Sequence, residues 1–136
     1  MAIDTEGMTT LIQVYDMRRS LEFYCGILGF EILDKAGPPE DIGWVLMKLN
    51  GVYLMLNTQY EMAERPPEPD RERFKAHGDT CLYFMCADPD AIYEQITQKG
   101  IVAEKPKIAP YGMKQLYFLD PDGYGICFQS AILANE

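Results

Sequence analysis

The sequence has little of what nucleic-acid-binding proteins and most metalloenzymes require. Only one of its 136 residues, His77, is histidine, and none of the four cysteines belongs to a C-x-x-C pair. Neither a zinc ribbon nor a thioredoxin-type motif is therefore indicated. Lysine and arginine number 12 against 21 aspartate and glutamate residues, and the resulting net charge of −9 argues against binding to nucleic-acid phosphates.

Long apolar runs and familiar catalytic motifs are also missing. Apolar runs such as Leu82–Ala87 are far too short to span a bilayer, and the first residues lack the basic and apolar regions of a signal peptide. The sequence contains no H-E-x-x-H, G-x-S-x-G, Walker A or G-x-G-x-x-G motif. We therefore expect a cytoplasmic protein, without membrane contact, in which residues 1–136 form a single domain.

What the sequence does contain is one pattern that occurs twice: a strand-like run, an acid, a helical segment and a glycine. The acids are Asp16 and Asp88, and each is expected to cap a helix by accepting from backbone N–H groups of its first turn. Gly29 follows 13 residues after the first acid, and Gly100 follows 12 residues after the second. Both are expected to adopt the left-handed conformation that ends a helix.

Each predicted helix is followed by further strands that tight turns connect. Asn50-Gly51 between two apolar runs is a strong hairpin signal, and Asp120-Pro121-Asp122-Gly123 suits a type I turn closed by a glycine in a bulge. Each half therefore predicts the order strand-helix-strand-strand-strand. The first module covers about residues 8–58, a proline-containing linker covers about 59–78, and the second module covers about 79–131.

These segments resemble the vicinal-oxygen-chelate superfamily, which includes glyoxalases, bleomycin-resistance proteins and dioxygenases. The resemblance extends from about Thr9 to Gln129. The segments that carry it are Asp16-Met17-Arg18-Arg19-Ser20-Leu21-Glu22-Phe23-Tyr24, Leu28-Gly29-Phe30 and Pro110-Tyr111-Gly112-Met113 through Asp120-Pro121-Asp122-Gly123-Tyr124. It implies an α+β fold of two βαβββ modules whose mixed sheets curl around a groove, in a homodimer. The pattern is most similar to bleomycin-resistance-like members.

Metalloenzymes of that superfamily place one ligand on the first and last strand of each module, and the resemblance puts these positions at Thr9, Met55, Cys81 and Cys127. None is His, Glu, Gln or Asp, although Mg²⁺, Mn²⁺ and Fe²⁺ need oxygen or imidazole ligands. No metal or other cofactor is therefore expected. His77 precedes Cys81 by a strand length of roughly 13 Å and is expected in the exposed linker. The thiols either bind a soft ion such as zinc or Cu(I), or line a dry groove.

Strand alternation predicts which side chains face the groove. Across the Asn50-Gly51 hairpin, the expected pairs are Lys48 with Tyr53, Leu46 with Met55, and Trp44 with Asn57. In the second module, the groove face is expected to hold Cys81, Tyr83, Met85, Tyr117, Cys127 and Gln129. The predicted ligand-binding residues are Gln13, Trp44, Leu46, Met55, Asn57, Tyr83, Tyr111 and Tyr117.

An aromatic, methionine-rich face of this kind stacks on planar compounds and adjusts around them, and its rings could also hold a cation. No Asp, Glu or His is expected on it as a general base. We therefore interpret the chain as a metal-independent homodimer that binds a small molecule, such as an antibiotic or another aromatic or cationic compound. Two alternatives remain open: a lyase, isomerase or dioxygenase with a displaced metal site, and a dimer whose aromatic face serves association alone.

Overall fold

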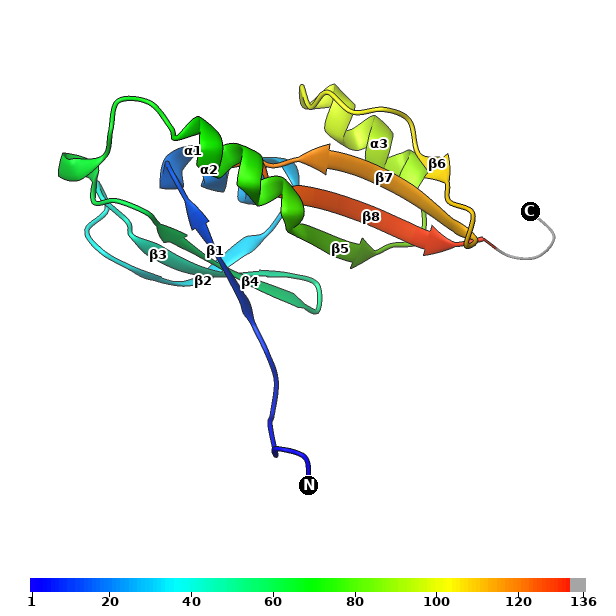
Figure 1. Ribbon diagram of the computed structural model, residues 1–136, viewed down its shortest axis with the longest axis horizontal. Coiled ribbons are helices and arrows are strands. Elements are labelled where there is room, and N and C mark those ends of the chain that lie inside the picture. Colours follow the sequence, from blue (N-terminus) through cyan, green and yellow to red (C-terminus); the bar gives the residue numbers. More distant parts are fainter. Residues whose placement is uncertain (133–136) are drawn as a thin grey trace. The chain divides into compact units, whose positions relative to one another are not determined.

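The computed structural model of the chain describes residues 1–132 (Figure 1). The chain divides into two compact units, Met1–Pro67 and Glu68–Glu136. Each unit contains a βαβββ module whose four strands form one mixed sheet. The predicted α+β class and its two modules are confirmed.

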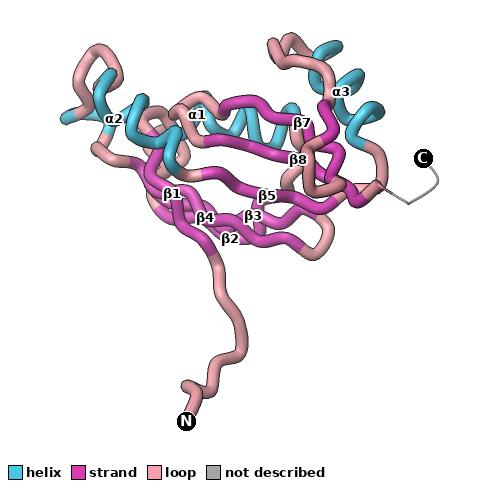
Figure 2. Tube along the Cα trace, turned by 45° about the vertical axis from the view of Figure 1, so that its right-hand side comes forward, coloured by secondary structure: helices cyan, strands magenta, loops and turns pink. Residues whose placement is uncertain are grey.

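The first unit has the strand order β1-β4-β3-β2, with β1 parallel to β4 and the other neighbours antiparallel. Figure 2 shows these strands in magenta. Its elements are β1 (Thr10–Val14), α1 (Met17–Leu21), the π-helical segment η1 (Glu22–Ile27), β2 (Glu31–Ala36), β3 (Trp44–Leu49), β4 (Val52–Thr58) and the short 3-10 helix η2 (Met62–Glu64).

The second unit repeats this topology in the order β5-β8-β7-β6, with β5 parallel to β8. Its elements are α2 (Arg71–Ala76), the short 3-10 helix η3 (His77–Asp79), β5 (Cys81–Met85), α3 (Pro89–Gln98), β6 (Lys107–Ile108), β7 (Met113–Leu119) and β8 (Gly125–Ala131).

The local signals that set these boundaries act as expected. The carboxylate of Asp16 accepts from the backbone N–H of Arg18, and that of Asp88 accepts from two backbone N–H groups at the start of α3. Gly29 and Gly100 have φ values of 90° and 93°, in the left-handed region that favours glycine. The predicted helix starts and ends are therefore confirmed.

Alternation along β3 and β4 separates a buried face from a half-exposed one. The three predicted hairpin pairs are confirmed by the register. Val45, Met47 and Leu56 on the other face are fully buried, and the Cys25 thiol in η1 lies 4.0 Å from the Met47 sulfur. The core of this unit therefore lies between the sheet and its helical segment, as the period of two predicts.

The core of the second unit follows the same rule. Leu116 and Ile126 are fully buried on β7 and β8. The rings of Phe84 and Phe128 stack with centroids 4.7 Å apart, and Ile96 on α3 is 2% exposed. The opposite face of these strands is thereby left to carry polar and aromatic side chains.

His77 is not an exposed linker residue, so that prediction is wrong. Its ring stacks on Tyr124 with a centroid distance of 4.0 Å, and its Nδ1 lies 2.7 Å from the backbone carbonyl oxygen of Asp122. A carbonyl can only accept, so Nδ1 carries the proton and Nε2, 3.3 Å from the Tyr124 hydroxyl, can accept from it. His77 thus connects η3 to the turn between β7 and β8.

Replacing His77 with alanine is expected to lower the free energy of unfolding by about 1–3 kcal/mol, because the Asp122 carbonyl loses its donor and Tyr124 loses its stacked ring. Urea denaturation followed by circular dichroism measures this loss. Lys75→Ala, an exposed position on α2, is the control and is expected to change stability by less than about 0.5 kcal/mol. Equal midpoints for the two variants would contradict the role assigned to His77.

Candidate functional site

The sheet of the second unit exposes an aromatic face, defined here by Tyr83, Met85, Tyr117 and Gln129. The register places Tyr83 and Tyr117 on opposite sides of Cys127. Their hydroxyl oxygens lie 2.6 Å apart, and their rings meet edge to face at 87° with centroids 6.0 Å apart. Because Tyr83 and Tyr117 are 52% and 45% exposed, they form a fixed corner that presents aromatic surface to a ligand.

Tyr117 in this corner and Cys127 beneath it stay uncharged at neutral pH. Cys127 is fully buried, and burial raises the pKa of its thiol. The hydrogen bond with Tyr83, in which a Tyr117 O–H that donates must stay protonated, raises the pKa of the Tyr117 phenol, and burial adds to this effect. Neither group is a base or a nucleophile in that state. The aromatic face is therefore suited to binding rather than to proton transfer.

An amide network borders the aromatic face. The Gln115 Nε2 donates to the Tyr111 hydroxyl and to the Gln129 Oε1, both at 2.9 Å. The Gln129 Nε2 in turn lies 3.5 Å from the Met85 sulfur. Sequence reasoning missed Gln115, although alternation from Tyr117 places it on the same face. With 7% of its surface exposed, Gln115 holds its neighbours in position.

A cavity of about 310 Å³ adjoins this network within the second unit. Its lining residues are Glu104, Lys105, Lys107, Ile108, Ala109, Gln115 and Tyr117. The Lys107 ammonium pairs with Glu104 at 2.7 Å. The volume lies at the lower end of the range for small-molecule pockets. Residues 104–106 precede β6 as irregular chain, and residues 104–109 carry no motif, so no sequence pattern pointed to this lining.

The predicted binding residues of the first unit share one sheet face. Gln13 lies opposite Asn57 in the parallel register of β1 and β4, and the Asn57 Nδ2 lies 3.4 Å from the Gln13 Oε1. Trp44, Leu46 and Met55 are half-buried on the same face. The strand pairing therefore brings these five residues together. Their role in ligand binding stays a prediction.

The side chains at the four positions equivalent to metal ligands are poor ligands for hard divalent metal ions. Thr9 precedes β1 and Met55 lies on β4. In the second unit the equivalent positions are Cys81 and Cys127, whose soft sulfur atoms are poor ligands for hard ions such as Mg²⁺ and Mn²⁺. Within residues 1–132, no three His, Cys, Asp or Glu side chains are grouped closely enough to hold an ion.

None of the helices formed by residues 1–132 combines the length and the apolar content that crossing a membrane requires.

Comparisons with known proteins connect this geometry to a family. The model of the Glyoxalase/Bleomycin resistance protein/Dioxygenase superfamily matches residues 8–128. Over 111 aligned residues the chain is 32% identical to the uncharacterized protein YaeR of Escherichia coli K12. The alignment covers 79% of this chain and 82% of YaeR. It is 24% identical over 129 residues to the metallothiol transferase FosB of Lysinibacillus sphaericus, covering 93% of this chain and 82% of FosB.

Solved structures share the fold. The structure of the antibiotic binding protein TnmS3 from Streptomyces sp. CB03234 aligns with a TM-score of 0.68 and 23% sequence identity. The alignment covers 96% of this chain and 98% of the TnmS3 chain. The structure of SMU.1112c has a TM-score of 0.74 at 26% identity, over 93% of this chain and 98% of its own.

Proposed function

This chain belongs to the Glyoxalase/Bleomycin resistance protein/Dioxygenase superfamily, and we propose that it binds a small planar aromatic molecule without the help of a metal ion. The observation that carries this proposal is the corner formed by Tyr83 and Tyr117, whose hydroxyls are hydrogen-bonded and whose rings remain exposed. Two tyrosines already held in place lose little conformational freedom when a ligand stacks on them.

The surroundings of the corner favour a planar molecule that carries hydrogen-bonding groups. Met85, 68% exposed, can adjust around the edge of a ring, and the Gln129 amide offers a donor and an acceptor. Glu104, Lys105 and Lys107 line the adjoining cavity, and because Lys107 pairs with Glu104, Lys105 leaves the lining with one net positive charge. A neutral or anionic aromatic compound therefore fits this face better than a cation does.

The chemistry of the side chains at the ligand-equivalent positions supports metal independence. Threonine, methionine and two cysteines stand where the superfamily's metalloenzymes carry hard ligands, and the raised pKa of Tyr117 keeps its phenol protonated and so unavailable as a base. TnmS3, described as an antibiotic binding protein, supports the proposal because it uses this fold to hold a ligand. FosB, a metallothiol transferase, represents the enzymatic alternative.

The test is calorimetric titration of protein dialysed against EDTA with 2-naphthol, 2-naphthoate and proflavine, which are a neutral, an anionic and a cationic planar probe. We expect the first two to bind more tightly than proflavine. Tyr117→Ala is expected to weaken their binding about 10- to 100-fold, as the loss of a central aromatic contact does. Tyr117→Phe keeps the ring and is expected to retain most of the affinity.

Tyr53→Ala is the matched control, because Tyr53 is also 45% exposed but lies on β4 of the first unit. It is expected to leave the affinity unchanged. Equal losses for the two alanine variants, or no binding of any probe at millimolar concentration, would contradict the proposal. A stoichiometric metal that EDTA removes together with binding would instead support the enzymatic alternative.

A further inference from the structure

A second cavity, of about 590 Å³, lies wholly within the first unit. Its walls come from α1 and η1 on one side, and from the segments 39–42 and 58–62 on the other. Thr58 continues the parity of the buried Leu54 and Leu56 on β4. The cavity is therefore on the helix-covered side of the sheet, away from the face that carries Trp44 and Met55.

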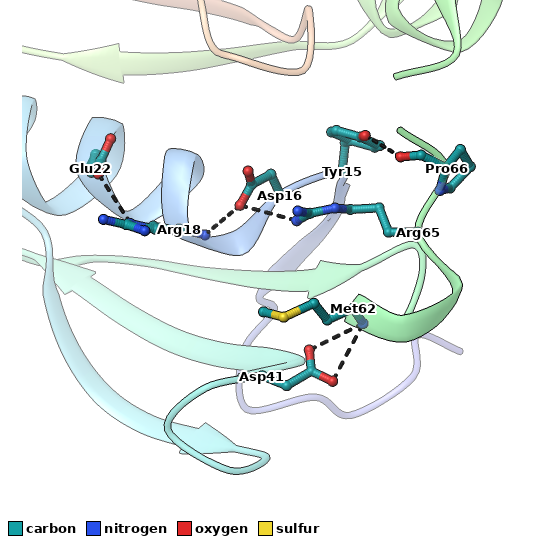
Figure 3. Close-up of polar contacts among 8 residues, drawn as sticks. All are labelled: Tyr15, Asp16, Arg18, Glu22, Asp41, Met62, Arg65 and Pro66. Atoms are coloured by element: carbon teal, nitrogen blue, oxygen red, sulfur yellow. Dashed lines mark hydrogen bonds and ion pairs between the residues drawn. The ribbon is translucent and has the colours of Figure 1, made fainter. Parts of the chain in front are cut away.

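The lining combines apolar surface with acidic groups. Leu21, Ile42 and Met62 contribute apolar surface, and the volume falls within the range that drug-sized ligands occupy. Figure 3 shows the polar groups: Asp16 lies on the helical side, and Asp41 lies below it beside Met62. The lining includes four carboxylates, of Asp16, Glu22, Glu40 and Asp41, against one guanidinium, of Arg18.

The carboxylates differ in how far they are already neutralised. Asp16 caps α1 and pairs with Arg65 at 3.4 Å. Glu22 pairs with Arg18 at 3.7 Å, but both side chains are mostly exposed, so this pair is weak. Among residues 1–132, no cationic side chain lies within ion-pair distance of Asp41. Its oxygens only approach the Met62 backbone N–H, at 3.4 Å.

Specific backbone conformations shape both walls of the cavity. Gly37 has a φ of 107°, and a Cβ there would come within 2.6 Å of the Asp41 carbonyl oxygen, so the loop can fold this tightly only around glycine. On the helical side, the Leu28 N–H bonds to the Phe23 carbonyl five residues earlier at 3.0 Å. Such π-turns are rare and occur frequently at functional sites. Gly26, which lies within this turn, lines the cavity.

We infer that this cavity binds a small amphipathic cation, a molecule with one amine and an apolar body. The amine pairs with the Asp41 carboxylate, and the body covers Leu21, Ile42 and Met62. Charge complementarity selects the cation, because the lining carries more carboxylates than its single guanidinium can neutralise. This site differs from the aromatic face of the second unit in location, charge and ligand class.

The test is calorimetric titration of the full chain with 4-phenylbutylamine and with its neutral analogue 4-phenylbutanol. We expect the amine to bind at least about fivefold more tightly than the alcohol, and this preference to fall as salt is added. Asp41→Asn should remove the preference. Asp34→Asn, an exposed carboxylate on β2 outside the cavity, is the matched control and should preserve it.

A second variant fills the cavity itself. A Cβ added at Gly26 would meet nothing within 4 Å, so Gly26→Leu should fold, occupy the space and weaken amine binding by about 10-fold or more. Gly78→Leu, equally unobstructed but in the second unit, is its control. If Gly26→Leu fails to fold, Asp41→Asn still decides the question.

Three results would overturn the inference: equal affinity for the amine and the alcohol, amine binding unaffected by Asp41→Asn, or amine binding lost in Tyr117→Ala. The last result would assign the amine to the aromatic face. Because the naphthalene probes and the amine report on different units, failure of this inference and failure of the proposed function are distinguishable.

Discussion

Replacing Gly123 with alanine is expected to lower the free energy of unfolding by about 3 kcal/mol or more. Gly123 closes the turn between β7 and β8 with a φ of 87°, which costs any other residue conformational energy. A Cβ at this position would also overlap the carbonyl oxygen of Phe74 on α2 and lie 3.1 Å from its carbonyl carbon. Backbone atoms cannot move aside as the end of a flexible side chain can, so α2 must shift.

Gly112→Ala separates the two causes. Gly112 has a similar φ of 82°, but a Cβ there would meet nothing within 4 Å. In Gly112→Ala the free energy of unfolding should therefore fall only by the conformational cost of the positive φ, about 1–2 kcal/mol. Urea denaturation followed by circular dichroism compares the two variants. If both lose the same free energy, the contact with Phe74 is not the cause.

The same experiment tests the prediction of a single domain. Trp44 is the only tryptophan and lies in the first unit, whereas Gly123 lies in the second. If residues 1–136 unfold cooperatively, Trp44 fluorescence in Gly123→Ala should report the same lowered midpoint as circular dichroism. A Trp44 transition that remains at the wild-type urea concentration would show that the units unfold separately.

The elements that local chemistry determines could be predicted from the sequence. The caps at Asp16 and Asp88 depend on neighbours two or three residues away. The Asn50-Gly51 turn fixed the register of β3 and β4, and the register in turn determined which side chains share a face. The fold and the predicted faces therefore followed from short-range patterns.

The parts that could not be predicted depend on contacts between distant residues. His77 contacts Asp122 and Tyr124, which lie 45 and 47 residues later in the sequence. Its place in the linker therefore gave no indication of its partners. The cavity of the first unit exists because the loop after β2 folds back around Gly37. No periodicity or residue spacing predicts that this loop folds back. From the sequence, Asp41 was only one of 21 acidic residues.

The net charge of the chain does not show how its charged residues are distributed between the two cavities. The value of −9 is a sum over the whole chain and does not show where the acidic groups gather, and the rings of the predicted face could hold a cation. In the structure, two lysines and one glutamate line the cavity beside that face, whereas four carboxylates and one guanidinium line the cavity of the first unit. The predicted preference for aromatic or cationic compounds is thereby divided into two proposals, one for each unit.

The helical wall of the first-unit cavity depends on Tyr24, and Tyr24→Ala is expected to lower the free energy of unfolding by about 3–5 kcal/mol. Tyr24 is fully buried in η1. Its ring packs edge to face against Phe23, at a centroid distance of 4.9 Å, and against Phe30, at 5.9 Å. Removing it leaves a void between the helical segment and the sheet, and urea denaturation measures the loss.

Tyr24→Phe retains the ring and its packing, so it should retain most of the stability and serve as the control. The two variants should also differ in function at low temperature, where both are folded. Because Tyr24 holds η1 in place, Tyr24→Ala should weaken 4-phenylbutylamine binding through displacement of Glu22 and Gly26, which line the cavity, while Tyr24→Phe should not. Unchanged amine binding in a folded Tyr24→Ala variant would show that η1 keeps its position without this ring.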